Sequence, residues 1–309
     1  MRNFIKRTTY FLLTLLILII IGAFIPPTPY VSESLLFATQ KKDSLLANTE
    51  TPRIIFVGAS NIAFGLNSQI IKDSLHLNPI NTGLHIGFGL KYMLDNTLSY
   101  IKEGDIVVLS FEYEHFFRDL NWTSEELIRT IFEVNRTNPK YMLLNQQQYL
   151  SSIKHFIKIS LSRFTPKEYF GFNIRPDYSI NSFNEYGDVF THWNKEKGIF
   201  PIHDFIDPTS LFNEEVIQKI KNFENDVLKI GGTVYVTYPG FQDKSFIKNE
   251  CIIKKVEDKY IENRFTILGT PEKYILPDSL MYDSPYHPSK NGADIRTLLF
   301  IEDFKKVRM

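Results

Sequence analysis

Apolar residues along this chain form short continuous runs that alternate with longer segments of helical periodicity. The runs predicted as strands are Ile54–Val57, Ile80–Gly83, Asp105–Phe111, Thr233–Tyr238 and Phe265–Leu268. Such runs, without polar alternation, are typical of a parallel sheet covered on both faces. The helices predicted between and after them are Ile70–Leu75, Lys91–Ile101, Ser210–Lys229, Lys244–Asn263 and Ser289–Val307. This order predicts an α/β fold, a three-layer α/β/α sandwich around a central parallel sheet.

The regular alternation loosens in the middle of the chain, between Glu112 and Asp207. Ser124–Val134 is predicted as a capped helix, Tyr141–Leu161 as a second helix, and Phe164–Phe205 as loops rich in aromatic residues. We therefore expect one domain over residues 52–309 with a helical, aromatic-rich insertion at about 116–207. Ordinary loop packing is favoured over a substrate platform for any single aromatic residue there.

The amino terminus carries a separate signal. Arg2, Lys6 and Arg7 precede the apolar run Tyr10–Ile25, which is 16 residues long. A spanning helix needs about 20 residues and a signal-peptide core about 7–15, and no small-residue cleavage site follows the run. We predict an uncleaved transmembrane anchor with a cytoplasmic tip over residues 1–27, in preference to a signal peptide.

The flanking charges predict the orientation of this anchor. Positive residues remain on the cytoplasmic side, so the single-pass segment places the amino terminus in the cytoplasm. Everything after Pro27 then lies in the periplasm or outside the cell. Residues 28–51 are predicted as a juxtamembrane linker containing an amphipathic helix, Ser32–Ala47.

Composition narrows the classes of function. Lys+Arg and Asp+Glu are both 35, and no basic run follows the amino terminus, so a nucleic-acid partner is not expected. Cys251 is the single cysteine of the chain, which excludes an internal disulfide and a cysteine metal cluster. No ligand-spaced His/Asp cluster is evident in the sequence either. We expect neither a metal nor a cofactor.

Ser60 follows the first predicted strand in the turn Gly58-Ala59-Ser60-Asn61. Open α/β sheets bind ligands at the carboxyl ends of their strands, and a helix start offers free N–H groups there. A serine so placed suits a nucleophile whose reaction forms an oxyanion. The simpler interpretation is a serine that caps a helix, which is commoner for an isolated Gly-x-Ser.

A second chemical motif lies shortly before the last predicted helix. Asp283 and His287 lie on one short loop and could supply a base and the carboxylate that orients it. Asp278 is a competing partner for the histidine. A loop histidine that is hydrogen-bonded to local backbone is the simpler alternative.

Together these motifs resemble three blocks of the SGNH/GDSL hydrolase family. The blocks are Gly58-Ala59-Ser60-Asn61, Asn81-Thr82-Gly83-Leu84-His85, and the segment from Asp283 to His287. The resemblance implies that Ser60 is the nucleophile and that Asp283 and His287 complete the catalytic set. It also implies an oxyanion hole formed by the backbone of Ser60 and Gly83. Asn61, Glu112 and Tyr286 are candidates for lining the site.

The chain departs from the family pattern in two places. The family has Asp-x-x-His in its last block, whereas three residues separate Asp283 from His287 here. The third block supplies an asparagine after the strand Asp105–Phe111, and this chain has Glu112-Tyr113-Glu114-His115 instead. An ionised Glu112 only accepts hydrogen bonds and would oppose an oxyanion.

An anchored extracytoplasmic domain of this kind resembles the accessory proteins of cell-envelope acylation, which work beside a membrane-bound O-acyltransferase. The resemblance implies acyl transfer to or from a hydroxyl of an envelope glycan, through an acyl-serine intermediate. Whether water or a sugar hydroxyl accepts the acyl group stays open at this point. The alternative is a non-catalytic protein that uses a degenerate site to hold polysaccharide or a membrane partner.

Overall fold

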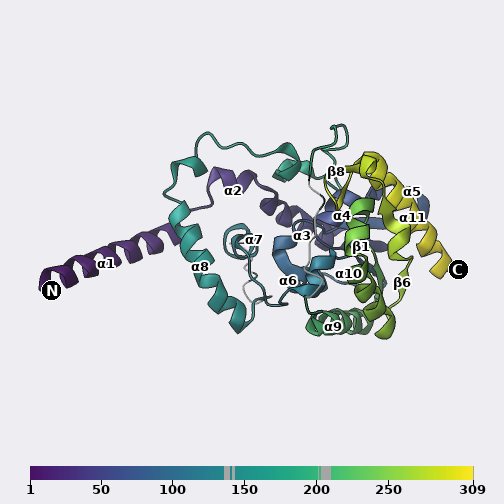
Figure 1. Ribbon diagram of the computed structural model, residues 1–309, viewed down its shortest axis with the longest axis horizontal. Coiled ribbons are helices and arrows are strands. Elements are labelled where there is room, and N and C mark those ends of the chain that lie inside the picture. The colour runs from purple at the N-terminus through teal and green to yellow at the C-terminus, as the bar shows by residue number, and fades with distance from the viewer. Residues whose placement is uncertain (136–139, 141–142, 201, 203–209, 309) are drawn as a thin grey trace.

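The computed structural model describes residues 1–135, 140, 143–200, 202 and 210–308, and is built around a five-stranded sheet (Figure 1). Its strands, in spatial order, are β2 (Asn78–Asn81), β1 (Arg53–Val57), β3 (Ile106–Leu109), β4 (Thr233–Thr237) and β6 (Ile267–Leu268). Every neighbouring pair is parallel. The predicted α/β class with a central parallel sheet is confirmed. The second strand begins and ends two residues earlier than predicted.

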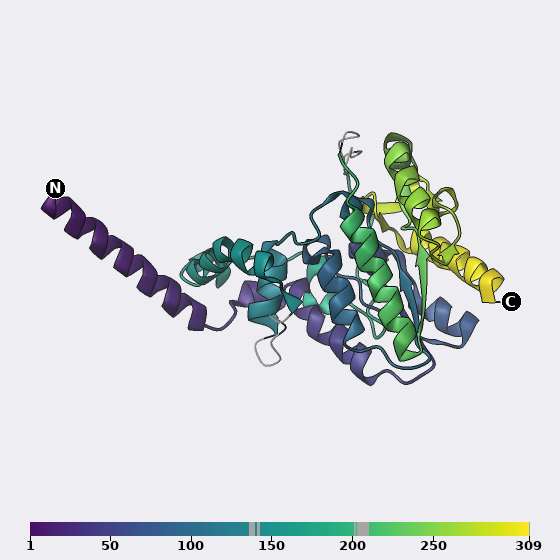
Figure 2. The ribbon, with the colours of Figure 1, turned by 90° about the horizontal axis from the view of Figure 1, so that it is seen from below.

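Helices lie on both sides of this sheet (Figure 2). They are α4 (Ser60–Gly65), α5 (Ser68–Leu75), α6 (Gly89–Leu98), α9 (Glu214–Ile230), α10 (Asp243–Glu262) and α11 (Lys290–Arg308). Helices α6 and α9 pack together on one side, and α5 and α11 pack together on the other. Helix α9 ends where the sequence predicted, because Gly231 adopts φ 95°, a left-handed conformation that glycine reaches without strain.

The middle segment contains two of the predicted helices in altered form. Helix α7 (Glu125–Arg129) is capped by the Ser124 hydroxyl, and a π-helical turn, Thr130–Val134, continues it. Helix α8 (Gln146–Ser162) starts at a capping box formed by Asn145 and Gln148. The start predicted at Tyr141, and the end of the aromatic stretch at Phe205 and of the insertion at Asp207, lie outside the described residues.

The amino-terminal helix α1 (Arg2–Phe24) is long and apolar enough to cross a membrane, which confirms that part of the prediction. Its 23 residues extend over about 34 Å, and a bilayer core is about 30 Å thick. Most of its large apolar side chains are exposed. The helix projects away from the sheet domain in both views (Figures 1 and 2).

The helix predicted at Ser32–Ala47 is interrupted in the structure. It is divided into α2 (Pro29–Glu33), a 3₁₀ turn (Leu35–Phe37) and α3 (Ala38–Asn48). Ser34 causes the break, because it forms an isolated antiparallel β-bridge with Ser179 and is therefore extended.

Helix α3 packs into the sheet domain through buried side chains that include Lys42. The Lys42 ammonium donates to the backbone carbonyls of Asn81 (3.0 Å), Gly83 (2.6 Å) and Gly187 (2.5 Å). Burial lowers the pKa of Lys42 to about 7, although the Asp188 carboxylate favours its charge. This contact joins the segment after α1 to the end of β2 and the loop that follows it.

A buried ion pair holds α3, β1 and β3 together. Arg53 and Asp105 are both fully buried, and the Arg53 Nε donates to Asp105 Oδ1 over 2.7 Å. The same guanidinium donates to the carbonyls of Leu46, in α3, and Tyr100. Because every charge in the cluster is hydrogen-bonded, the pair can remain buried, whereas loss of either partner would leave an unpaired charge.

Two small strand pairs complete the fold beside the main sheet. Strand β5 (Phe241–Gln242) pairs in parallel with β7 (Ile275–Leu276). Strand β8 (Met281–Ser284) pairs antiparallel with β9 (His287–Pro288), with an irregular register between Met281 and Ser284. The β8–β9 hairpin carries the predicted catalytic loop.

Candidate active site

The turn that holds Ser60 leaves the carboxyl end of β1, as predicted. A Cβ on Gly58 would come within 2.3 Å of the Ser110 carbonyl oxygen, so only glycine fits this close approach to the end of β3. Ser60 is the first residue of α4. No described residue accepts a hydrogen bond from its backbone N–H, which leaves that donor available to a ligand.

The hydroxyl of Ser60 is hydrogen-bonded to the carboxyl group of Glu112. Ser60 Oγ and the Asn61 backbone N–H both donate to Glu112 Oε1, over 2.9 Å and 3.2 Å. Burial and the nearby Glu114 carboxyl raise the pKa of Glu112 to about 8, against these hydrogen bonds. At neutral pH Glu112 is therefore mostly a neutral acid, which can donate a hydrogen bond as well as accept one.

Asn61 stabilises the serine turn. Its Oδ1 accepts from the Ala59 N–H over 3.1 Å, and its Nδ2 donates to the Ser110 carbonyl over 2.9 Å. The side chain is 1% exposed. Both polar ends of Asn61 are thus used to join the turn after β1 to the end of β3.

Gly83 packs directly against the serine turn. A Cβ there would come within 2.6 Å of the Ala59 carbonyl and of the Ala63 nitrogen, which explains a glycine at this position. Its N–H, predicted as an oxyanion donor, donates instead to Asn81 Oδ1 over 2.9 Å. In this conformation the Gly83 N–H is therefore occupied by a side chain of its own loop.

The predicted pairing of Asp283 with His287 is present in the structure. His287 Nδ1 lies 2.8 Å from Asp283 Oδ1, across the β8–β9 hairpin. Ser284 and His287 are paired residues of this hairpin, so the additional residue relative to Asp-x-x-His is accommodated in its turn. The competing Asp278 is ion-paired with Lys197 instead.

The environment of Asp283 keeps its carboxylate charged. Burial opposes ionisation, but hydrogen bonds from His287, from the Tyr178 hydroxyl (2.9 Å) and from Arg175 Nη2 (2.7 Å) outweigh it and lower the pKa of Asp283 to about 2. A charged Asp283 accepts the Nδ1 proton of His287. No described residue forms a hydrogen bond with the other ring nitrogen, Nε2, so in the neutral tautomer with the proton on Nδ1 its lone pair is free, as a general base requires.

Helix α4 connects the serine turn with the histidine hairpin. The Phe64 ring stacks on the His287 ring with centroids 4.1 Å apart and an interplanar angle of 9°. Ser60 and His287 thus lie at the same end of the sheet, on elements that touch. Among the described residues no hydrogen bond joins the Ser60 hydroxyl to His287, because that hydroxyl is directed to Glu112.

Tyr286 links the histidine hairpin to the segment after β3. Its hydroxyl donates to Glu114 Oε2 over 2.9 Å and accepts from the Tyr113 N–H over 3.1 Å. The ring packs against Phe241, with centroids 4.6 Å apart, and is 3% exposed. Tyr286 is therefore a buried residue that connects the hairpin with the segment after β3, and it does not line open space.

Arg175 and Tyr178, which hold Asp283, were not identified from the sequence. Tyr178 belongs to the aromatic-rich stretch that was predicted, but nothing there distinguishes it from its neighbours. No motif or pattern in the sequence indicated a role for Arg175. Both lie more than a hundred residues from Asp283 in the sequence, so only the folded insertion brings them to it.

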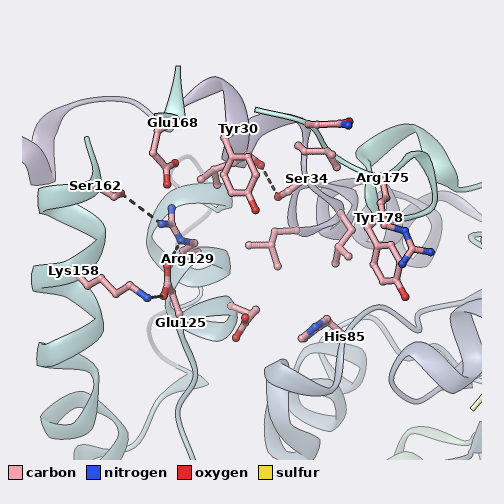
Figure 3. A pocket seen from close by; sticks show the side chains of 16 residues that line it. Tyr30, Ser34, His85, Glu125, Arg129, Lys158, Ser162, Glu168, Arg175 and Tyr178 are labelled. Carbon is pink, nitrogen blue, oxygen red and sulfur yellow. Dashed lines mark hydrogen bonds and ion pairs between the residues drawn. The ribbon is translucent and has the colours of Figure 1, made fainter. Parts of the chain in front are cut away.

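A cavity of about 520 Å³ borders this pair of residues (Figure 3). Arg175 and Tyr178 line it together with His85, and its other walls come from α7, α8 and the residues Tyr30, Val31, Ser34, Leu35, Leu36, Glu168, Asn173 and Ile174. His85 Nδ1 accepts from the Gly87 N–H over 2.9 Å. Burial lowers the pKa of His85 against the effect of the Glu126 carboxylate, and a proton gained by His287 would lower it further.

Comparison with known proteins found no matching family model, no matching curated protein and no matching solved structure. No group of three or more metal-ligating side chains lies together in the described part of the chain.

Proposed function

We propose that the chain is a membrane-anchored, extracytoplasmic serine acyltransferase or acylesterase of the SGNH type, which acts on cell-envelope polysaccharide. The observation that carries this proposal is the Asp283–His287 pair, whose free Nε2 lies on a hairpin in contact with the helix that begins at Ser60. An oriented base beside a strand-end serine is the arrangement of nucleophilic catalysis. The SGNH-like α/β/α sandwich is part of the same proposal.

The chemistry proceeds in two steps that share His287. The Ser60 hydroxyl rotates from Glu112 towards His287 Nε2, its oxygen bonds to the acyl carbon, and its proton moves to Nε2. His287 then protonates the departing oxygen as the bond to it breaks, which leaves acyl-Ser60. In the second step, the oxygen of water or of a sugar hydroxyl bonds to the acyl carbon and its proton moves to Nε2. The bond between the acyl carbon and Ser60 Oγ then breaks, and Nε2 returns the proton to Oγ.

The anchor and the orientation define the setting of this reaction. Helix α1 would hold the domain at the outer surface of the cell membrane, with an envelope glycan as substrate and a membrane-bound O-acyltransferase as partner. Charged and aromatic side chains line the cavity beside Asp283, among them Arg175, Glu126 and Tyr178, and these suit a polar, hydroxyl-rich ligand.

Covalent labelling tests the nucleophile. The full chain in detergent is treated with a serine-directed phosphonate ester, and the adduct is mapped by mass spectrometry. We expect one adduct, on Ser60, because the helix that begins at Ser60 contacts the hairpin of the Asp283–His287 pair. Ser60→Ala should remain unlabelled, whereas Ser110→Ala, at the end of the neighbouring strand, should label normally. An adduct at another residue, or esterase activity that survives in Ser60→Ala, would contradict the assignment.

A non-catalytic binding protein is the second candidate, and two contacts favour it. The Ser60 hydroxyl is bonded to Glu112, and the Gly83 N–H is bonded to Asn81, so neither is directed to a substrate. This candidate predicts glycan binding without phosphonate labelling of Ser60. Labelling and binding measured on the same preparation therefore separate the two.

The orientation gives a further prediction. A reporter enzyme that is active only outside the cytoplasm, fused after Met309, should be active and remain in the membrane fraction. Arg2, Lys6 and Arg7 keep the amino terminus inside, so the carboxyl terminus must lie outside. A soluble active reporter would show cleavage of the segment, and an inactive membrane-bound one would show the opposite orientation.

A further inference from the structure

Helix α8 exposes an apolar stripe on the side that faces away from the domain. Its members are spaced three, four and seven residues apart, so they share one face of the helix: Leu150, Ile153, Ile157 and, just beyond its end, Phe164. Leu150 is 66% exposed and Ile153 is 55% exposed. Buried residues such as Ser152 and Ile159 lie on the opposite face, and α8 packs against α7. Exposed apolar side chains aligned in this way mark a contact surface.

The apolar helix α1 is seated at one end of this stripe. A Cβ on Gly22 would come within 2.1 Å of the Ser160 carbonyl oxygen, so α1 packs backbone to backbone on α8 at this point. Ser160 lies between Ile157 and Phe164 along the helix. Both views show α8 running across the direction of α1 rather than along it, at the side of the domain from which α1 leaves (Figures 1 and 2).

We propose that this face of α8 lies on the lipid surface of the membrane that α1 spans, so that α8 is an interfacial helix in the membrane plane. The inference rests on the anchor in the proposed function. A helix that crosses a spanning helix at the point where that helix leaves the bilayer lies parallel to the membrane. An apolar face turned to the lipid, with charged residues beside it, is typical of such helices.

Charge and aromatic residues fit a lipid surface better than a protein partner. Lys154 is exposed on α8 beside the stripe, and Lys167 is exposed shortly after its end. Basic residues at this level are attracted to anionic headgroups. Tyr149, also exposed on the outer side of α8, has the amphipathic ring that is enriched at membrane interfaces.

The contact would place the cavity beside the membrane. Lys158 and Ser162 of α8 form part of the cavity wall, and Tyr30, in the segment that follows α1, forms another part. With α8 on the lipid, the cavity and the Asp283–His287 pair are held at a constant height above the bilayer. A substrate or acyl donor attached to a lipid could then reach the cavity without leaving the membrane surface.

Depth-dependent quenching tests this contact in the full chain. Cys251→Ser removes the natural thiol, and single cysteines are introduced by Ile153→Cys on the stripe, Leu16→Cys in α1 and Ile247→Cys on α10. Ile247 is the matched control, because it is apolar and 73% exposed but lies on a helix away from α1. Each variant is labelled with bimane and reconstituted into phosphatidylethanolamine–phosphatidylglycerol vesicles with or without spin-labelled lipid.

We expect spin-labelled lipid to quench bimane at Leu16→Cys and Ile153→Cys by at least about twofold and to leave Ile247→Cys unchanged. Quenching at Leu16→Cys but not at Ile153→Cys would overturn the proposed contact of α8 with lipid and leave the anchor intact. The stripe would then be assigned to a protein partner. Absence of quenching at Leu16→Cys would overturn the anchor and this proposal together. Phosphonate labelling of Ser60 in the same vesicles reports on the proposed catalysis independently.

Discussion

Replacing Asp283 by asparagine is expected to slow acylation of Ser60 by about 10⁴-fold, the loss seen when the orienting carboxylate of a serine protease triad is removed. Asparagine cannot stabilise the imidazolium of His287, and its amide can hold the wrong tautomer of the ring. The folded protein should survive, with a loss of about 1–3 kcal/mol from the weakened hydrogen bonds to His287, Tyr178 and Arg175. The rate of phosphonate labelling, measured well below the melting temperature, checks this.

The matched control is Asp278→Asn. Asp278 is the other acidic residue ahead of the histidine, and it contacts Lys197 and Gln242 rather than His287. We expect its labelling rate to stay within about twofold of the unmodified chain, since exposed ion pairs contribute little. If Asp278→Asn is the slow variant and Asp283→Asn labels normally, the triad has been assigned in the wrong register.

Replacing Glu112 by glutamine is expected to stabilise the fold increasingly as the pH rises from about 4.5 to about 8. In the unfolded chain Glu112 ionises near its ordinary pKa of 4.5, whereas burial in the folded state raises its pKa to about 8. Between these values the unfolded state binds fewer protons than the folded state does. The free energy of unfolding of the native chain therefore falls by up to about 1.4 kcal/mol per pH unit, and by at most about 5 kcal/mol in all. Glutamine does not titrate, so the variant lacks this loss. Thermal unfolding measured across this pH range checks it.

The same substitution tests whether the neutral or the ionised form of Glu112 supports acylation of Ser60. A neutral Glu112 beside Ser60 can donate to an oxyanion, whereas an ionised one repels it. Phosphonate labelling of the native chain should therefore fall above about pH 8, and Glu112→Gln should label at high pH. In Glu114→Gln the titrating Glu112 remains but lacks a neighbouring carboxyl that raises its pKa, so the loss should persist and begin at a lower pH. A high-pH loss that persists in Glu112→Gln but disappears in Glu114→Gln would refute this role.

The protonation state of Glu112 decides whether this glutamate, in the place of the family's asparagine, opposes an oxyanion. From the sequence it is an acidic residue in the place of an amide donor, and an ionised carboxylate there would oppose catalysis. In the folded chain it is buried beside Glu114, where the charged form is disfavoured. A neutral carboxyl group can donate a hydrogen bond as well as accept one, as the missing amide side chain also can. The sequence shows that the residue is a glutamate, but whether its carboxyl group carries a proton depends on burial in the folded chain.

The order of strands and helices was readable from the chain because it depends on local patterns. Continuous apolar runs such as Ile54–Val57 must be buried on both faces, and the glycine pair at Gly231 ends a helix wherever it stands. The predicted elements are wrong where contacts between residues far apart in the sequence determine the local structure. The helix predicted at Ser32–Ala47 is broken at Ser34 by pairing with Ser179, which lies far along the chain.

The candidate site divides in the same way. Ser60, Asp283 and His287 were selected from the sequence as a candidate nucleophile, carboxylate and base, because they lie in a strand-end turn and on one short loop and resemble blocks of a hydrolase family. Tertiary structure alone decided the partners of those groups: Arg175 and Tyr178 hold Asp283, Glu112 takes the Ser60 hydroxyl, and Asn81 takes the Gly83 N–H. Hydrogen bonds and pKa values arise from groups brought together across long stretches of chain, and no local pattern encodes them.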